Sequence, residues 1–142
     1  MTDVLVNLSL LILRVVLGAI MVSHGIPKVQ KRVPLGKKWH DHYGVPAVTV
    51  PATGLLQVVG GVLLISGVFT QLVAFIMTLD MLAALYICIF NSHHKEPFNS
   101  VTPVKGWDVN LLLVGALIVL VLLGGGVWSL GHVVPALGWW LW

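Results

Sequence analysis

The chain contains four long runs of apolar residues, separated by short polar segments. Each run approaches or exceeds the roughly 20 residues that an α-helix needs to cross the hydrocarbon core of a bilayer. Apolar and polar residues do not alternate within the runs, as they would in the strands of a transmembrane barrel. The pattern predicts an all-α integral membrane protein, a four-transmembrane-helix antiparallel bundle that forms one domain over residues 1–142. The predicted spans are residues 4–26, 46–68, 71–90 and 107–127.

The composition excludes the water-soluble classes of protein. Of the 142 residues, 58% are hydrophobic and 9% are charged, whereas a soluble domain carries roughly 25% charged residues to wet its surface. A soluble enzyme, a disordered tail and a nucleic-acid-binding domain are therefore excluded, and the lipid bilayer is the expected environment. The first run lacks a preceding positive residue and carries Arg14 in its middle, so we expect a retained span rather than a signal peptide.

The basic residues predict the orientation of the bundle. Seven of the eight Lys and Arg residues lie in segments 28–45 and 91–106, which share a side in an even-numbered bundle. Basic loops face the cytoplasm, so we expect a multi-pass protein of the inner (plasma) membrane with both termini outside. Segment 28–45 mixes aromatic and charged residues and is expected to lie in the membrane interface. Tryptophans expected to anchor the opposite interface are Trp128, Trp139, Trp140 and Trp142.

Glycines recur within the predicted spans. Small residues let helix backbones approach closely in lipid, so we interpret these glycines as packing positions. They are Gly18, Gly54, Gly60, Gly61, Gly67, Gly115 and Gly124 to Gly126.

Two charged residues fall within the predicted spans at similar depth. Arg14 lies about ten residues into the first span and Asp80 about nine into the third, and these spans run in the same direction. A lone charge in lipid costs several kcal/mol, and pairing lowers that cost. We therefore expect an Arg14–Asp80 ion pair, which either serves function or only fixes the helix register. Gln57, at mid-depth on the second span, is a third member or forms an interhelical hydrogen bond.

A second polar group gathers at the predicted cytoplasmic ends of the spans. His24 and Lys28 close the first span, and Asp108 opens the fourth. Histidine titrates near neutrality, so such a group can pass protons or bind a metal. The remaining members are His93 and His94 at the end of the third span, and His40, Asp41 and His42 in segment 28–45.

The chemistry of this group favours a quinone over a metal. Adjacent helical residues point about 100° apart and do not easily share one ion, so no metal site is predicted. The two carbonyls of a quinone need hydrogen-bond donors and a proton route to water, which histidine, aspartate and lysine supply. A groove between the spans would take its apolar tail. Cys88 lies within an apolar run and is expected to pack as a small hydrophobe.

Short motifs along the chain resemble the DoxX family. The first span carries Arg14-Val-Val-Leu-Gly18, then His24-Gly25 and Lys28. The second carries Gln57-Val-Val-Gly-Gly61, then Gly67-Val-Phe-Thr70. The last begins after Gly106-Trp107-Asp108 and closes with Gly-Gly-Val-Trp128-Ser-Leu130.

The resemblance covers about residues 8–131 and implies a four-helix bacterial or archaeal inner-membrane protein. Relatives include the large subunit of thiosulfate:quinone oxidoreductase and a membrane oxidoreductase complex of mycobacteria, while many others have no assigned activity. The chain departs from the family pattern at three positions. Gln57 stands where the family often has glutamate, Val127 where it often has arginine, and Asp108 where it usually has glutamate.

Three functions remain open from the sequence. The first is a quinone-linked oxidoreductase or one of its subunits, in which Arg14 holds a substrate anion or quinone oxygen while His24 and Asp108 move protons. Because the chain has no flavin motif, heme-ligand pair or cysteine cluster, this function calls for a partner redox subunit. The second is a non-catalytic subunit that anchors or stabilises a redox complex, or packs as a homo-oligomer. The third is a small transporter.

Overall fold

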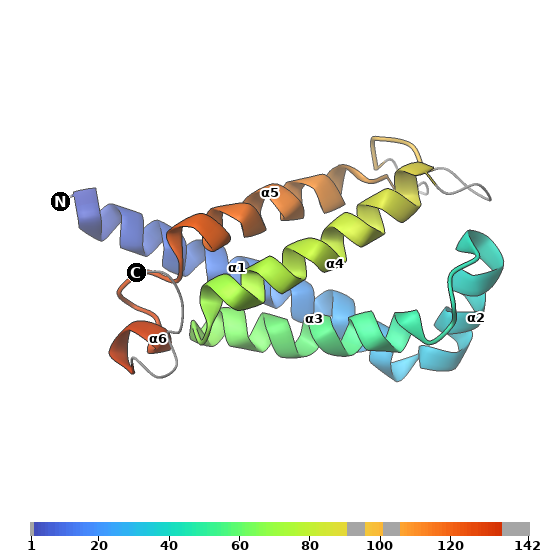
Figure 1. Cartoon of the computed structure of the whole chain (residues 1–142), viewed down its shortest axis with the longest axis horizontal. Helices are drawn as coiled ribbons and strands as arrows, with labels where there is room; N and C mark the ends of the chain where they lie inside the picture. Colours follow the sequence, from blue (N-terminus) through green and yellow to red (C-terminus); the bar gives the residue numbers. More distant parts are fainter. Residues whose placement is uncertain (1, 91–95, 101–105, 135–142) are drawn as a thin grey trace.

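The computed structural model describes residues 2–90, 96–100 and 106–134, and every regular element in this part of the chain is an α-helix. Four helices run along the long axis of the molecule (Figure 1). They are α1 (Thr2–Gln30), α3 (Thr49–Ser66), α4 (Thr70–Phe90) and α5 (Asp108–Leu123). Two shorter helices lie at opposite ends: α2 (Arg32–Tyr43) and α6 (Leu130–Val133).

Three of the long helices, α1, α3 and α4, are long and apolar enough to cross a membrane. The chain is therefore a multi-pass membrane protein. The fourth, α5, is apolar but has 16 residues, which is about 24 Å of helix for a hydrocarbon core of roughly 30 Å. It ends at Gly124, whose φ of 73° is suited to glycine. The structure thus has three spanning helices and a shorter fourth one where the sequence predicts four spans.

The first helix extends beyond its predicted end. The predicted span 4–26 stops just before Pro27, yet α1 continues to Gln30, and the Pro27 carbonyl accepts a hydrogen bond from the Lys31 amide at 2.9 Å. Proline removes one backbone donor, and a helix in a membrane bundle tolerates this loss where packing supports it. Segment 28–45, predicted to lie in the interface, forms the end of α1 and the whole of α2.

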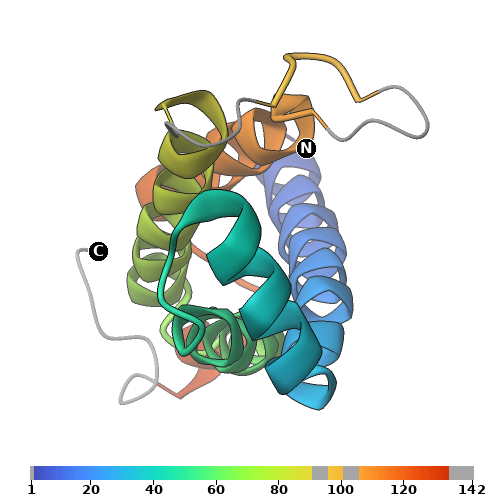
Figure 2. The ribbon, with the colours of Figure 1, turned by 90° about the vertical axis from the view of Figure 1, so that its right-hand side faces the viewer.

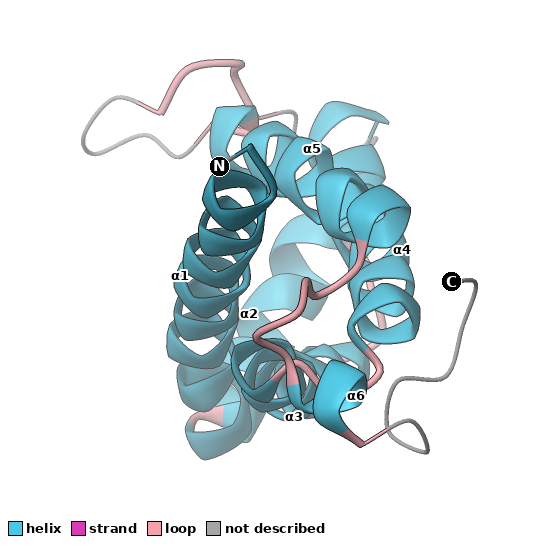
Figure 3. Cartoon of the chain, turned by 90° about the vertical axis from the view of Figure 1, so that its left-hand side faces the viewer, coloured by secondary structure: helices cyan, strands magenta, loops and turns pink. Residues whose placement is uncertain are grey.

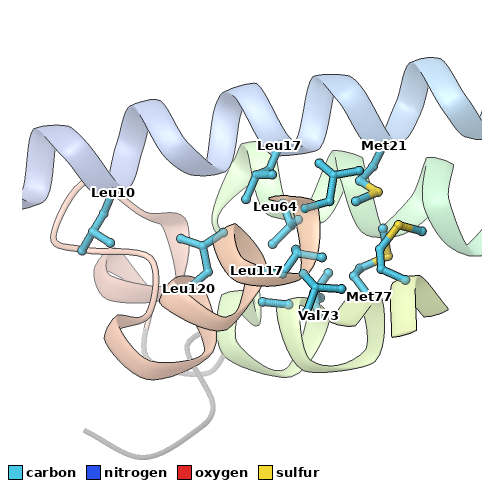
Figure 4. Close-up of a cluster of buried hydrophobic side chains, with 12 residues drawn as sticks. Leu10, Leu17, Met21, Leu64, Val73, Met77, Leu117 and Leu120 are labelled. Carbon is cyan, nitrogen blue, oxygen red and sulfur yellow. The ribbon is translucent and has the colours of Figure 1, made fainter. Parts of the chain in front are cut away.

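The four long helices form a ring seen from either end. Figure 2 looks onto the end that α2 crosses, and Figure 3 looks onto the end where α6 and the N-terminal start of α1 lie. Buried apolar side chains fill the ring, and Figure 4 shows Leu17, Leu64, Met77 and Leu117 converging from α1, α3, α4 and α5. The ring therefore has an apolar middle and two ends of different construction.

Glycines set the distance between α1 and α3. A Cβ atom on Gly18 would lie 2.5 Å from the Gly61 carbonyl oxygen, and one on Gly61 would lie 2.6 Å from the Gly18 oxygen. Gly25 and Gly54 repeat this reciprocal contact two turns away. The packing role predicted for Gly18, Gly54 and Gly61 is thus confirmed, whereas a Cβ on Gly115 of α5 would meet nothing within 4 Å.

Candidate functional site

A chain of three polar side chains crosses the interior of the bundle from α1 through α3 to α4. The Lys28 ammonium donates to Gln57 Oε1 at 2.9 Å, and Gln57 Nε2 donates to Asp80 Oδ2 at 2.7 Å. Gln57 is only 2% exposed. An ammonium can only donate and an ionised carboxylate can only accept. The Gln57 amide therefore joins the two groups, with its oxygen facing Lys28 and its nitrogen facing Asp80. We call these residues the polar chain.

The local structure of α1 and α3 explains how Lys28 reaches Gln57. Helical side chains lean toward the N-terminus of their helix, so a lysine in the last turn of α1 points back into the bundle. Gly54 makes room for its stem, because a Cβ there would lie 2.6 Å from the Lys28 Cβ. The close α1–α3 packing therefore also places the Lys28 amine beside Gln57.

Trp39 of α2 lies against the polar chain. Its ring centroid is 5.6 Å from the Lys28 Nζ, a distance suited to a cation–π contact. The Trp39 ring in turn meets Tyr43 edge-on, with centroids 5.4 Å apart. The ammonium is therefore bounded by an amide on one side and by an indole on another.

Tyr43 fastens α2 to the segment that precedes α5. Its hydroxyl donates to Glu96 Oε1 at 2.6 Å, and the same oxygen lies 4.0 Å from His42 Nε2. Burial, then the hydrogen bond to Glu96 and its negative charge, raises the pKa of the Tyr43 hydroxyl well above its ordinary value. The hydroxyl thus keeps its proton and remains a donor.

Arg14 lies at the other end of the bundle and does not pair with Asp80. It is 2% exposed, and its guanidinium donates to the carbonyls of Ile65, at 3.2 Å, and of Trp128. The predicted Arg14–Asp80 ion pair is therefore wrong. On α3, Arg14 contacts Ile65 and Asp80 contacts Gln57. These two α3 residues are eight positions, or roughly 12 Å, apart along the helix, so Arg14 and Asp80 lie at different depths in the bundle.

The partners of Arg14 are backbone groups that the helices leave open. Ile65 lies in the last turn of α3, and Trp128 lies between α5 and α6. Backbone carbonyls without a helical partner must be satisfied by protein where water is scarce. Two further side chains also bind backbone groups at this end. Asn7 Oδ1 accepts from the Val127 amide at 2.9 Å, and Gln71 Nε2 donates to the Val121 carbonyl at 3.1 Å.

The remaining predicted residues are dispersed. His24 lies on an exposed side of α1, and Asp108 accepts hydrogen bonds from the Ser100 hydroxyl at 2.6 Å, the Ser100 amide and the Val109 amide. Asp108 thus lies in the first turn of α5 and orders the segment before it through Ser100. His40 and Asp41 are exposed on α2. Predicted residues outside the described ranges are His93, His94, Trp139, Trp140 and Trp142.

Three residues near the polar chain were not predicted as part of a site: Trp39, Tyr43 and Glu96. The first two are four residues apart, a spacing that places side chains on one face of a helix, so the sequence held a signal for that pair. Glu96 is distant in sequence from both, and only the tertiary structure brings it to Tyr43.

Comparison with known proteins places the chain among small membrane proteins. The DoxX family model matches residues 9–90. An uncharacterized membrane protein of Mycobacterium tuberculosis is 29% identical over 130 residues, an alignment that covers 86% of this chain and 78% of the relative. No solved structure gives a significant match. The matched residues 9–90 include α2, α3 and all three members of the polar chain.

Proposed function

Since the chain belongs to the DoxX family of membrane proteins, we propose that it is a quinone-linked subunit of an oxidoreductase in the inner membrane. The observation that carries this proposal is the polar chain: a lysine, an amide and a carboxylate joined by hydrogen bonds inside an apolar bundle. Buried ionisable groups in membrane helices are costly and typically mark a functional pathway.

The polar chain has the donors and acceptors that quinone chemistry requires. An ammonium has three N–H donors, and among the described residues one of them is used by Gln57. The others can bind a quinone carbonyl, which accepts hydrogen bonds and takes up a proton on reduction. Lys28 would then take up a new proton from water, and the nearby negative charge of Asp80, joined to the amine through Gln57, would favour that uptake. In this proposal Lys28 and Asp80, rather than His24 and Asp108, support the movement of protons.

Electrons would reach the quinone from a partner subunit. The sequence contains one cysteine and no flavin-binding motif, so the proposed role is to bind and protonate the quinone while the partner holds the redox cofactor. The α2 end would face the cytoplasm because it carries most of the basic residues. Protons would then enter the site from that side.

Ligand-induced stabilisation tests the proposal. A short-chain quinone added to the purified protein should raise its Tm in detergent, because a ligand that binds the folded state stabilises it. The Lys28→Met variant should lose this shift, whereas Lys38→Met, which removes an exposed lysine of α2, should keep it. A shift of equal size in Lys28→Met and the parent would contradict the proposal, as would no shift in either.

A second candidate function, a non-catalytic subunit that stabilises a redox complex, is favoured by the outer face of α5. Gly115 is exposed there with open space around it, and small residues in membrane helices commonly lie where another helix packs. This function predicts that Gly115→Leu releases a stoichiometric partner during native extraction. Retention of the same partner by Gly115→Leu would exclude this face as the contact.

A further inference from the structure

Helix α2 turns one face toward the bundle. Gly36, Trp39 and Tyr43 occupy positions i, i+3 and i+7, which lie on one side of a helix. Gly36 is buried, and a Cβ on it would lie 2.8 Å from the Ala47 carbonyl oxygen. Lys37 and Lys38 are exposed. The inner face of α2 is thus distinct from its basic outer face.

We propose that this inner face is the cover of the Lys28 site, with Trp39 as the covering residue and with Tyr43 and Glu96 as the residues that position it. The proposal rests on the proposed function, because it assigns the control of access to the same amine. The Trp39 ring lies over the Lys28 ammonium at 5.6 Å. A ligand or a water molecule approaching Lys28 from the α2 side therefore meets the indole first.

The bond between Tyr43 and Glu96 fixes the cover at its far end. The Glu96 side chain is only 10% exposed, and its amide donates to the Cys88 carbonyl at 3.0 Å, which ties it to the last turn of α4. Tyr43 belongs to α2, which lies between α1 and α3 in the chain. One hydrogen bond therefore links α2 to the α4–α5 connection across the end of the bundle.

The connections at the two ends of α2 would allow this helix to change its angle relative to the bundle. A single residue, Lys31, separates α2 from α1, and Gly44 with a φ of 70° ends the helix at its other side. Glycine adopts this left-handed conformation without steric cost. Release of Tyr43 from Glu96 would remove a hydrogen bond that ties α2 to the α4–α5 connection, so that Trp39 would move off Lys28 more often.

Acylation of lysines in the intact protein tests the cover without a ligand. A water-soluble N-hydroxysuccinimide ester reacts with exposed amines, and peptide mass spectrometry gives the rate at each lysine. Lys28 should react slowly in the parent and about tenfold faster in Trp39→Ala. Lys37 and Lys38, on the outer face of α2, are internal controls whose rates should stay the same. Trp39→Phe, which keeps an aromatic ring, should resemble the parent.

The positioning residues have a matched pair of substitutions. Glu96→Gln keeps an oxygen that accepts from Tyr43 and should leave the Lys28 rate close to that of the parent. Glu96→Leu and Tyr43→Phe remove the bond and should raise the rate several-fold. An unchanged Lys28 rate in Trp39→Ala would overturn the cover, and an unchanged rate in both Glu96→Leu and Tyr43→Phe would overturn the positioning role.

The acylation experiment and the quinone experiment can fail separately. If the parent shows no quinone-induced Tm shift but Trp39→Ala exposes Lys28, the cover stands and the quinone assignment fails. If the quinone-induced Tm shift depends on Lys28 but the Lys28 acylation rate is the same in Trp39→Ala and the parent, the quinone assignment stands and the cover fails. If both hold, a bound short-chain quinone should dissociate faster from Trp39→Ala than from Trp39→Phe.

Discussion

At the scale of single residues, two cations of the bundle, the half-buried Lys28 and the buried Arg14, differ in what they bind. Lys28 donates to a side-chain amide that leads to Asp80, so its charge has a nearby counter-charge. Arg14 donates to two backbone carbonyls. The planar guanidinium fork can bind two acceptors in fixed directions, which a lysine ammonium cannot reproduce. Arg14 therefore holds segments of the chain together, and Lys28 is the residue available for chemistry.

Replacement of Arg14 should cost stability. Arg14→Met leaves the Ile65 and Trp128 carbonyls without their donor, and we expect the free energy of unfolding to fall by about 2–4 kcal/mol. Arg14→Lys should recover only part of the loss. Thermal unfolding in detergent measures both variants. Equal Tm values for the parent and Arg14→Met would show that these hydrogen bonds do not stabilise the fold.

Double-mutant cycles distinguish the two pairings of Asp80. Lys28→Met and Asp80→Asn should show a coupling energy of about 1 kcal/mol or more, because Gln57 joins the two residues. Arg14→Met and Asp80→Asn should be additive to within about 0.5 kcal/mol, because they share no partner. The cycles are read from denaturant unfolding in detergent. A larger coupling of Asp80 to Arg14 than to Lys28 would restore the ion pair expected from the sequence.

At the scale of the elements, the apolar runs located the long helices well, but they did not define how the helices pair. Long apolar segments predict spans because length and hydropathy are local properties of the chain. The Arg14–Asp80 pairing relied on depths counted separately along two helices. The true register depends on which glycines meet, and the Gly18–Gly61 and Gly25–Gly54 contacts are set by tertiary packing. The Tyr43–Glu96 bond was unpredictable for the same reason.

The α1–α3 contact should tolerate no added carbon. Gly61→Ala places a Cβ within 2.6 Å of the Gly18 carbonyl oxygen, and we expect a loss of at least about 2 kcal/mol in the free energy of unfolding. Gly115→Ala is the matched control, since its Cβ meets nothing within 4 Å, and should change stability by less than about 0.5 kcal/mol. If the two variants unfold alike in detergent, the glycine contact does not determine the packing.

At the scale of the whole molecule, the two ends of the bundle have different constructions. At the end with α6 and the start of α1 (Figure 3), the side chains of Asn7, Arg14 and Gln71 bind backbone groups near the ends of helices. At the α2 end (Figure 2), Trp39 lies against Lys28 of the polar chain, and the lysines Lys37 and Lys38 of α2 are exposed. The first end is closed by its own hydrogen bonds, so access to Lys28 is expected from the second.

The orientation of these ends can be read from labelling of introduced cysteines. In a Cys88→Ala background, Asp3→Cys and Lys38→Cys place exposed thiols at opposite ends of the bundle. A membrane-impermeant maleimide should label position 3 in intact cells, and position 38 only in inverted vesicles, because the proposed orientation places the basic end in the cytoplasm. Labelling of position 38 in intact cells would reverse the proposed orientation.

The most direct test of the polar chain as a quinone site is mass spectrometry of the quinone retained after extraction in native lipid. The parent and Lys38→Met should retain quinone in about equal amounts per protein, and Lys28→Met and Asp80→Asn should retain much less, because each removes one end of the chain. Equal retention by the parent, Lys28→Met and Asp80→Asn would mean that the polar chain does not bind the quinone.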